Sequence, residues 1–449
     1  MSPAPWSGRR LHVLGIAGAG MSALAVLAEG LGAEVTGSDR GESRYLAGVR
    51  EAGIPVAIGH DAANLPDGDD LVVVSSTAIP EDNPERVEAR RRGLPDRSRH
   101  QLLREVCAEH RVIAVAGAHG KTTTSAMTVH ALQGAGEDPS YLVGGILRST
   151  GHNVHVGTSG WLVVEADESD RSFLETHPEI AVVTSIELDH HGTYAGRADL
   201  DDAFRTFLAG ADERVVWDRR ELDRVLPADV DHVHRYDVDG SEAGDGAQRF
   251  AWGDRTVGLR QPGLHNAWNA VAALTAASLA GADPDRAAAA MLDFPGTGRR
   301  FEQTGLGPHD VVVIDDYAHH PTEVAATIRA ARTLEPDRVV AVFQPHLFSR
   351  TQMLATAFGA ALAEADLVCL LDVYPARERA EDFPGVDGLT LARTAADAAD
   401  GRTVLLLPTI ADAVERLPAL LRAGDICLCM GAGDVDAVAR GLVAAAGRG

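Results

Sequence analysis

Lysine is almost absent from this chain of 449 residues. Lys and Arg together number 41, of which one is Lys121 and 40 are Arg, whereas Asp and Glu number 65, so the formal net charge is −24. So acidic a chain excludes nucleic acid and anionic membrane surfaces as expected partners, because both carry negative charge. Positive charge for binding phosphate must therefore be local, supplied by single Arg or Lys residues and by metal ions.

Cysteine and long apolar runs are also scarce. Four cysteines exclude a disulfide scaffold, and the apolar run around Cys427 and Cys429 predicts a buried strand rather than a zinc site. We therefore expect a reducing, cytoplasmic setting. No unbroken apolar stretch of about 18 residues is present, which predicts no membrane insertion. The run after Arg9 and Arg10 resembles a signal peptide, but its glycines favour a strand, a turn and a helix.

Strand and helix patterns alternate along three blocks, as is typical of parallel α/β domains. We predict domains at 1–109, 110–298 and 299–449, the first and last Rossmann-like and the central one with a mostly parallel sheet. The weakly alternating segment 231–261 predicts a peripheral β-meander, and an alanine-rich helix is expected over 266–280.

The lone lysine lies in Gly117-Ala-His-Gly-Lys-Thr-Thr-Thr124, which follows an apolar strand pattern and precedes a helical one. Such a loop places backbone N–H groups on phosphates, the lysine on the β/γ-phosphates and a Thr hydroxyl on Mg²⁺. Arginine replaces this compact charge poorly. A chance surface turn is the alternative, which the lysine distribution disfavours. We predict a nucleoside triphosphate site formed by Gly117, Ala118, His119, Gly120, Lys121, Thr122 and Thr123.

Acids and histidines follow two further buried strand patterns. Glu165 ends an apolar strand and leads into Ala-Asp-Glu-Ser-Asp170, where a phosphate-loop enzyme places a metal ligand. Asp189-His190-His191 should emerge at the same sheet edge, and a neutral imidazole there can bind a second divalent ion. The alternative for both is a solvated surface loop.

The first block carries a second glycine loop, Gly15-Ile-Ala-Gly-Ala-Gly20, with Asp39 at the tip of the next strand. This pattern is the dinucleotide fingerprint, and a second nucleotide would satisfy the same geometry. A later strand ends in hydroxyls. We predict nucleotide contacts at this edge from Gly18, Ala19, Gly20, Met21, Ser22, Asp39, Ser75 and Ser76.

The third block carries two polar segments at strand-to-helix junctions, Asp315-Asp-Tyr-Ala-His-His-Pro-Thr-Glu323 and Gln344-Pro-His-Leu-Phe-Ser-Arg-Thr351. Open parallel sheets bind ligands at the carboxyl ends of their strands, which predicts a site here. Helix capping by Asp and Thr is the alternative and does not exclude a site.

These motifs, in this order and through nearly the whole chain, resemble those of the Mur ligase family. The motifs that add to the resemblance are Ser75-Ser-Thr-Ala-Ile79, Ser185-Ile-Glu-Leu-Asp-His190, His265-Asn266 with Asn269, Arg299-Arg-Phe301 and Asp372-Val-Tyr-Pro375. The resemblance implies a UDP-sugar-binding domain, a central ATPase and a C-terminal amino-acid-binding domain.

The resemblance also implies a reaction, that of the members that add L-alanine to UDP-N-acetylmuramate for peptidoglycan synthesis. ATP phosphorylates the lactyl carboxylate to an acyl phosphate, and the amine of L-alanine then displaces phosphate. The implied cofactor is Mg²⁺ or Mn²⁺. Whether copies associate as a homo-oligomer is left open.

Roles for individual residues follow from the resemblance alone. The implied catalytic residues are Lys121, Glu165 and His190, with Thr122, Glu165 and His190 as metal ligands. The implied ATP contacts beyond the loop are Asn266 and Asn269 on adenine, together with Arg300, Tyr317 and Arg350. The implied amino-acid and closure residues are His319, His320 and His346.

Several departures and rivals accompany the resemblance. Ala118 replaces the usual Thr, and His191 and Gly192 replace a hydrophobe and Asp. With Lys121 in the phosphate loop, no lysine remains for the carbamylated lysine of relatives that add later amino acids. The nearest rival joins a whole tripeptide to the same sugar nucleotide. Rivals from different classes are a nicotinamide dehydrogenase and a non-catalytic nucleotide switch.

Overall fold

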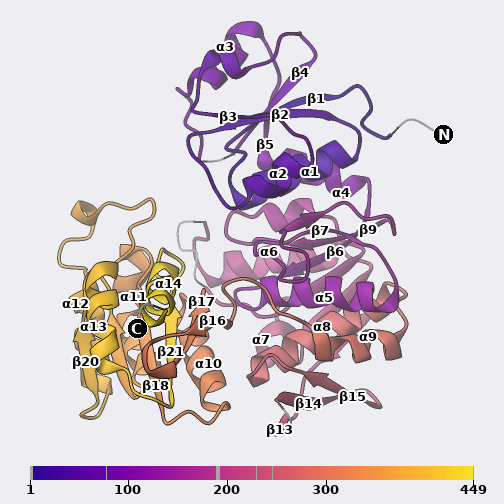
Figure 1. Ribbon diagram of the computed structural model, residues 1–449. Coiled ribbons are helices and arrows are strands. Elements are labelled where there is room, and N and C mark those ends of the chain that lie inside the picture. The colour runs from indigo at the N-terminus through magenta and orange to yellow at the C-terminus, as the bar shows by residue number, and fades with distance from the viewer. Residues whose placement is uncertain (1–3, 77, 189–192, 229, 245, 448–449) are drawn as a thin grey trace. The chain divides into compact units, whose positions relative to one another are not determined.

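The computed structural model describes residues 4–76, 78–188, 193–228, 230–244 and 246–447. The chain divides into two units, each with its own internal contacts (Figure 1). The first unit comprises residues 1–239, 251–258 and 268–295, and the second comprises 240–250, 259–267 and 296–449.

A five-stranded parallel sheet in the order β3-β2-β1-β4-β5 begins the first unit. Its strands are β1 (Arg10–Leu14), β2 (Glu34–Asp39), β3 (Val56–Ile58), β4 (Leu71–Ser75) and β5 (Asp96–Ser98). The helices are α1 (Ala19–Gly30), α2 (Leu46–Glu51), α3 (Pro84–Arg92) and α4 (Arg99–Ala108). Leu14 lies opposite Ser38 and Ser75, and Ser75 lies opposite Ser98. The loops after β1, β2, β4 and β5 therefore leave one edge of the sheet.

A seven-stranded sheet follows in the order β12-β11-β10-β6-β9-β7-β8, and only β8 runs antiparallel to its neighbour among the described pairings. Its strands are β6 (Arg111–Ala116), β7 (Ser140–Leu142), β8 (Val154–His155), β9 (Trp161–Glu165), β10 (Ile180–Val183), β11 (Glu213–Trp217) and β12 (Val233–Tyr236). The helices are α5 (Lys121–Ala135), α6 (Arg197–Ala209), α7 (Arg220–Asp223), α8 (Leu264–Leu279) and α9 (Pro284–Ala290). Val115 lies opposite Glu165 and Ala116 opposite Val183, so the ends of β6, β9 and β10 meet at one edge.

The predicted meander over 231–261 is only partly correct. Its first strand, β12, pairs parallel with β11 and so extends the central sheet. The rest forms a separate three-stranded sheet of β13 (Glu242–Gly244), β14 (Ala247–Trp252) and β15 (Arg255–Leu259), with β13 antiparallel to β14. Tyr236, at the end of β12, is buried, and its hydroxyl donates to Val183 O (3.5 Å). This burial and this hydrogen bond stabilise β12 in the larger sheet.

The second unit contains a six-stranded sheet in the order β16-β17-β21-β18-β19-β20, in which β16 alone is antiparallel among the described strands. Its strands are β16 (Glu302–Leu306), β17 (Val312–Asp316), β18 (Arg338–Phe343), β19 (Leu367–Leu370), β20 (Thr403–Leu406) and β21 (Asp425–Met430). The helices are α10 (Pro321–Arg332), α11 (Phe348–Leu362), α12 (Gly388–Ala398), α13 (Ile410–Leu420) and α14 (Asp436–Ala446).

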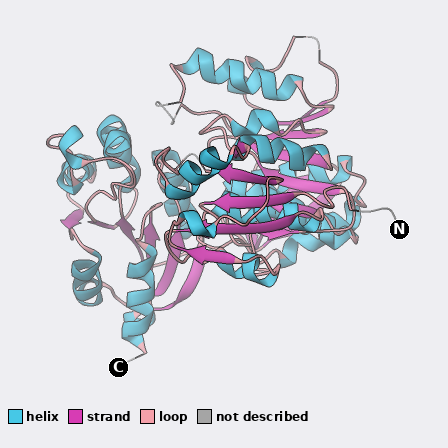
Figure 2. Cartoon of the chain, turned by 90° about the horizontal axis from the view of Figure 1, so that it is seen from above, coloured by secondary structure: helices cyan, strands magenta, loops and turns pink. Residues whose placement is uncertain are grey.

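The central strands of each large sheet are apolar on both faces because helices cover both faces. In β18, the run from Val339 to Phe343 is fully buried, with alternate residues in two separate apolar clusters. Strands and helices alternate along the chain. Figure 2 shows the strands with helices packed beside them. These features confirm the predicted class, α/β with mostly parallel sheets, whereas the exact domain boundaries stay predictions.

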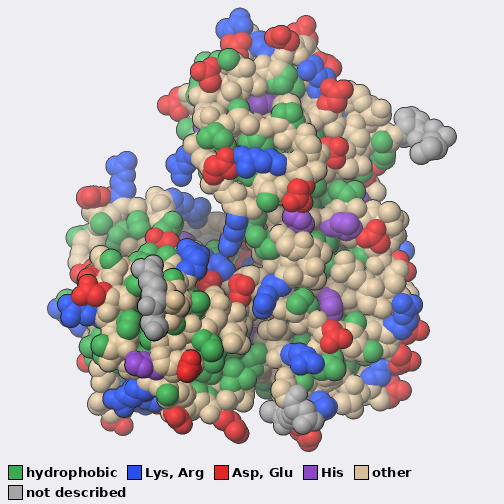
Figure 3. Space-filling model, viewed as in Figure 1, with side chains coloured by type: hydrophobic (Ala, Val, Ile, Leu, Met, Phe, Trp, Pro, Cys, Tyr) green, Lys and Arg blue, Asp and Glu red, His purple; other side chains and the backbone are tan. Residues whose placement is uncertain are grey.

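Two predictions from composition can be compared with the structure directly. Cys427 and Cys429 are unpaired and buried in β21, as the apolar run predicts. No helix among the described residues is long and apolar enough to cross a membrane. Acidic and basic side chains are interspersed over the face shown in Figure 3, so the net negative charge is spread rather than gathered there.

Candidate active site

The loop between β6 and α5 turns on two glycines with left-handed backbone. The φ angle is 139° at Gly117 and 81° at Gly120. A Cβ atom on Gly117 would lie 2.8 Å from Ser185 N, and one on Gly120 would lie 2.6 Å from Asn269 Oδ1. Only glycine fits both the conformation and the space. The loop can therefore present backbone N–H groups just before helix α5, where phosphate binds well.

Lys121 is the first residue of α5, and its ammonium group is held at the loop. Nζ donates to Gly117 O (2.6 Å) and to Glu168 Oε1 (3.0 Å), and the side chain is 15% exposed. Burial opposes the charge, but three carboxylates outweigh it and raise the pKa of Lys121 above its ordinary value. These carboxylates belong to Glu168, Asp167 and Glu165. The ammonium is therefore charged where a β/γ-phosphate would bind.

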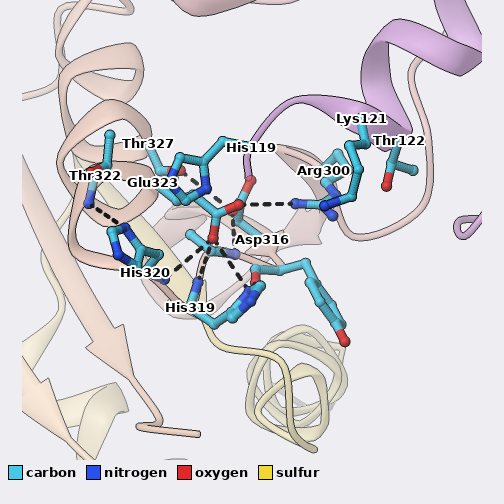
Figure 4. A network of polar contacts seen from close by, with 12 residues as sticks. His119, Lys121, Thr122, Arg300, Asp316, His319, His320, Thr322, Glu323 and Thr327 are labelled. Atoms are coloured by element: carbon cyan, nitrogen blue, oxygen red, sulfur yellow. Dashed lines mark hydrogen bonds and ion pairs between the residues drawn. The ribbon is translucent and has the colours of Figure 1, made fainter. Parts of the chain in front are cut away.

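Thr122 and Glu165 meet beside the loop and form the candidate metal site (Figure 4 shows Thr122 next to Lys121). Thr122 Oγ1 donates to Glu165 Oε1 (2.9 Å), and Gly144 N donates to Glu165 Oε2 (2.6 Å). A hydroxyl and a carboxylate are oxygen ligands of the kind that Mg²⁺ prefers, so the two residues fit the predicted ion. The third predicted ligand, His190, lies in 189–192, outside the described residues.

The segment after β10 holds the rest of the phosphate loop. Ala118 N donates to Ser185 O (3.1 Å), and His119 N donates to Ser185 Oγ (3.0 Å). Thr184 Oγ1 donates to His119 O (2.5 Å), and the His119 ring lies 3.3 Å from Glu187 Oε2. Ala118 contributes its backbone to this contact, which an alanine supplies as well as the threonine usual in the family.

The two asparagines predicted on adenine lie on α8, three residues apart. Asn269 Oδ1 accepts from Thr124 Oγ1 (3.2 Å) and lies directly against Gly120, so it braces the phosphate loop in the first unit. Asn266 belongs to the second unit, where its Nδ2 donates to Pro262 O (2.7 Å). Their contacts with adenine stay predictions.

The first glycine loop is held by the acid predicted to bind a nucleotide. Asp39 Oδ2 accepts from Ala17 N (2.9 Å), and its Oδ1 accepts from Gly41 N (3.3 Å). At the start of α1, Ser22 Oγ donates to Ala19 O (3.0 Å). Asp39 thus shapes the loop, and its contact with a ribose or base stays a prediction.

The remaining predicted contacts at this edge already have partners within the protein. Ser75 Oγ donates to Asp96 Oδ1 (2.9 Å), and Ser76 Oγ accepts from Ala78 N (3.3 Å). Met21 is buried in the core of the unit. The two serines therefore line the edge while stabilising the turns that leave it.

In the second unit, the segment after β17 caps helix α10 (Figure 4). Glu323 Oε2 accepts from the backbone N–H groups of His319 (3.0 Å) and His320 (3.3 Å). His320 Nδ1 accepts from Thr322 N (3.4 Å). Arg300 Nη1 lies 3.8 Å from Glu323 Oε1. This segment therefore does cap helix α10, as the alternative interpretation predicts. The capping bonds also fix the directions in which the two histidine side chains leave the turn.

Four aromatic rings cross the ends of β17, β18 and β19. Ring centroids are 5.3 Å apart for Tyr317 and His319, 6.2 Å for His319 and His346, and 5.8 Å for His346 and Tyr374. The last pair is nearly parallel, at 12°, and Arg350 Nη1 lies 3.2 Å from His346 Nδ1. The structure thus brings together the predicted residues Tyr317, His319, His346 and Arg350.

Backbone strain marks the turn between His346 and α11. Leu347 has φ 69° and ψ 133°, a conformation that a branched side chain rarely adopts. Its N–H donates to Tyr374 O (3.0 Å), which ties the turn to the segment after β19. Such strain costs about 1–3 kcal/mol and is found at binding and catalytic sites.

A buried ion pair supports the same edge. Arg299 Nε lies 3.2 Å from Asp315 Oδ2, and the guanidinium also donates to Gly431 O (2.7 Å) and Gly433 O (3.1 Å). Burial raises the pKa of Asp315 to about 6, although Arg299 opposes this. Arg299 thus ties the segment before β16 both to β17 and to the turn that follows β21.

The predicted site residues thus fall in both units. The first unit contains the first glycine loop with Asp39, Ser75 and Ser76, the phosphate loop with Thr123, and Glu165 and Asn269. The second contains Asn266, Arg300, Tyr317, His319, His320, His346 and Arg350.

Sequence reasoning did not single out three residues that the structure places at these edges: Glu168, Arg99 and Tyr374. Glu168 and Tyr374 belong to motifs that the sequence shows, and their contacts distinguish them only in three dimensions. Arg99 follows β5 without a recognisable motif.

Comparisons with known proteins cover nearly the full chain. Family models match residues 10–111 (Mur ligase family, catalytic domain), 115–277 (Mur ligase middle domain) and 299–433 (Mur ligase, glutamate ligase domain). A UDP-N-acetylmuramate–L-alanine ligase of Mycobacterium sp. (strain JLS) is 42% identical over 474 residues, covering 99% of this chain and 96% of the relative.

Two solved structures share the fold along the whole chain. The UDP-N-acetylmuramate-alanine ligase of Thermotoga maritima has a TM-score of 0.81 at 29% identity, covering 97% of this chain and 98% of that one. A murein peptide ligase of Psychrobacter arcticus 273-4 has a TM-score of 0.69 at 25% identity, covering 98% and 99%. The phosphate loop, its acidic neighbours and these matches lead to one conclusion: the chain belongs to the Mur ligase family.

Proposed function

We propose that this protein is an ATP-dependent ligase that joins L-alanine to the lactyl carboxylate of UDP-N-acetylmuramate in peptidoglycan precursor synthesis. The observation that carries the proposal is the charged Lys121 ammonium, held on the phosphate loop next to Thr122 and Glu165. The similarity to ligases named for this reaction, in Mycobacterium and Thermotoga, supports the choice of substrates.

The first step transfers a phosphoryl group. A carboxylate is a poor electrophile until one of its oxygens becomes a phosphate leaving group, so an oxygen of the lactyl carboxylate attacks the γ-phosphorus of ATP and ADP leaves. Lys121 stabilises the charge on the β/γ-phosphates as the phosphoryl group moves. Thr122 and Glu165 would hold Mg²⁺ or Mn²⁺, which neutralises phosphate charge, and His190 is the proposed ligand of a second ion.

The second step forms the amide bond. The amine of L-alanine attacks the carbonyl carbon of the acyl phosphate, a tetrahedral intermediate forms, and phosphate leaves as the amine loses a proton. His319, His320 and His346 are the proposed amino-acid and closure residues, and Asn266, Asn269, Arg300, Tyr317 and Arg350 are the proposed further ATP contacts. Domain closure would exclude water, which otherwise hydrolyses the acyl phosphate.

The proposed division of labour follows the domains. Residues 1–109 bind the sugar nucleotide, 110–298 bind ATP, and 299–449 bind the amino acid and complete the site. We place the reaction in the cytoplasm, where ATP is available.

Phosphate release tests the proposal. With ATP and Mg²⁺ present, phosphate should appear only when both UDP-N-acetylmuramate and L-alanine are added, and mass spectrometry should find their amide. Release that does not depend on the sugar nucleotide would contradict the proposal and favour a simple nucleotide switch.

A second candidate is ligation of a tripeptide to the same sugar nucleotide. The likeness to the Psychrobacter murein peptide ligase favours this candidate, because its TM-score and coverage are also high. Offering L-alanine and a tripeptide in equal concentration separates the two. We expect the alanine product to dominate, and a tripeptide product alone would reverse the assignment.

A further inference from the structure

Arg99 lies at the first glycine loop, although no sequence motif marks it. It is the first residue of α4 and directly follows β5, whose end Ser98 lies opposite Ser75. Arg99 therefore emerges at the same sheet edge as the loop before α1. A Cβ atom added to Gly20 would lie 2.8 Å from Arg99 Nε and 3.1 Å from Arg99 Nη2. The absence of a side chain at Gly20 thus allows the guanidinium to lie over the start of α1.

One end of this guanidinium is anchored by the acidic loop after β9. Arg99 Nη1 donates to Asp170 Oδ2 (2.9 Å) and to Ser172 Oγ (3.3 Å). Asp170 also contacts His100 Nε2 (3.0 Å) and accepts from Ser172 N (2.9 Å). Burial opposes ionisation of Asp170, but these bonds outweigh it and hold the pKa below its ordinary value. The carboxylate is therefore charged and fixed in place.

The other edge of the guanidinium points the opposite way. The described contacts of Arg99 with Asp170 and Ser172 use Nη1, whereas Nε and Nη2 are the atoms that lie over Gly20. An Nε/Nη2 edge is the fork that binds two oxygens of one phosphate. This edge thus lies against the first turn of α1, and the N-terminus of a helix favours an anion. Since the whole chain is strongly acidic, a diphosphate at this loop needs such a local cation.

We propose that Arg99 binds the diphosphate of the sugar nucleotide through its Nε/Nη2 edge, and that Asp170 is the positioning residue that holds it there. This inference rests on the proposed function, because it takes UDP-N-acetylmuramate as the ligand of the first glycine loop. Asp170 lies in the segment that also carries Glu165 and Glu168, which contact Thr122 and Lys121. The sugar-nucleotide loop and the phosphate loop are thereby linked through one short acidic segment.

A second ion pair between the same two elements provides a matched control. Arg104, also on α4, has its Nε 3.1 Å from Glu175 Oε2, and Glu175 follows Ser172 in the same short helix. Arg104 is 51% exposed, against 18% for Arg99. If the only role of these ion pairs is to dock α4 on the central domain, loss of either arginine should have the same effect on UDP binding.

The experiment measures UDP binding by titration calorimetry and steady-state kinetics in the full-length protein. Arg99→Ala should raise the Kd for UDP and the KM for UDP-N-acetylmuramate roughly 10- to 100-fold, the range for loss of a charged hydrogen-bonded pair. The KM for ATP should stay within about twofold, since the described contacts of Arg99 are with Asp170 and Ser172 and not with the phosphate loop. Arg99→Lys should recover part of the loss, because it restores charge without the fork. Arg104→Ala should change neither constant by more than about twofold.

Asp170→Asn tests the positioning role. We expect a rise in the UDP Kd of roughly 3- to 10-fold, and the double variant with Arg99→Ala should be no weaker than Arg99→Ala alone. An unchanged UDP Kd in Arg99→Ala, or equal effects of Arg99→Ala and Arg104→Ala, would overturn the inference. A wild-type protein that neither binds UDP nor turns over UDP-N-acetylmuramate would instead refute the proposed function, so the two failures are distinguishable.

Discussion

Two glycine loops in the first unit occupy equivalent places in the fold, but different side chains hold them. Each follows a buried parallel strand and precedes a helix, α1 in one case and α5 in the other. The first loop is closed by a carboxylate, since Asp39 accepts from Ala17 N. The second is closed by an ammonium, since Lys121 donates to Gly117 O and Glu168. We predict that the first loop holds a phosphate and the second transfers one, and that these side chains make the difference.

The largest predicted effect comes from changing Lys121, the side chain that distinguishes the second loop from the first. Lys121→Arg keeps the positive charge but replaces a compact ammonium with a wider fork. We expect kcat to fall about 1,000-fold, equivalent to about 4 kcal/mol of transition-state stabilisation. The KM for the sugar nucleotide should not change, because the first loop is untouched. Wild-type turnover, with the fold verified by circular dichroism, would remove the basis of the comparison.

The acidic neighbour of the second loop should matter almost as much. Glu165→Gln keeps the shape of the side chain but removes the negative charge and one of the two oxygens that accept from Thr122 and Gly144. We predict a fall in kcat of about 100-fold and a higher Mg²⁺ concentration for half-maximal rate, because a neutral amide is a weaker ligand. Glu179→Gln, in an exposed pair with Arg111, is the control and should behave as wild type. A normal Mg²⁺ dependence in Glu165→Gln would argue against the metal role.

Glycine substitutions sharpen the comparison of the two backbones. Gly120 has φ 81° and an added Cβ would meet Asn269 at 2.6 Å, whereas Gly18 has φ −73° and its nearest contact would be 3.4 Å. Gly120→Ala should therefore lower the free energy of unfolding by about 1–3 kcal/mol, and Gly18→Ala by less than about 0.5 kcal/mol. Thermal unfolding of the two variants measures this directly. Equal losses would show that the loops are not strained differently.

The second unit also has a carboxylate at the edge of its sheet, that of Asp315, and it should make the stability of the protein depend on pH. The pKa of Asp315 is raised from 3.8 to about 6, chiefly by burial. A raised pKa means that the folded state binds the proton more tightly, so this group favours folding below about pH 4 and loses that contribution as pH rises to about 6. Relative to Asp315→Asn, wild-type stability should fall by at most about 3 kcal/mol across this window. Parallel pH curves for the two proteins would contradict the assignment.

Much of the fold could be predicted because apolar runs end in polar residues at the sheet edges. Strands β2, β9, β18 and β21 match the runs that the sequence shows, and Lys121 with Glu165 lies where strand order predicts. The edge strand β16 (Glu302–Leu306) was not predicted, because it is short, largely uncovered and carries a bulge between Gln303 and Gly305. Arg99 was missed for a different reason. Its partner Asp170 is 71 residues away in the sequence, and no local sequence pattern predicts a contact at that separation.

Transfer of oxygen from the substrate carboxylate to phosphate tests the central claim most directly. The lactyl carboxylate of UDP-N-acetylmuramate is labelled with ¹⁸O and incubated with the enzyme, ATP, Mg²⁺ and L-alanine. If the Lys121 loop moves the γ-phosphoryl group onto that carboxylate, each phosphate released will carry one ¹⁸O atom and the amide will keep the other. Amide formation with unlabelled phosphate would contradict the account.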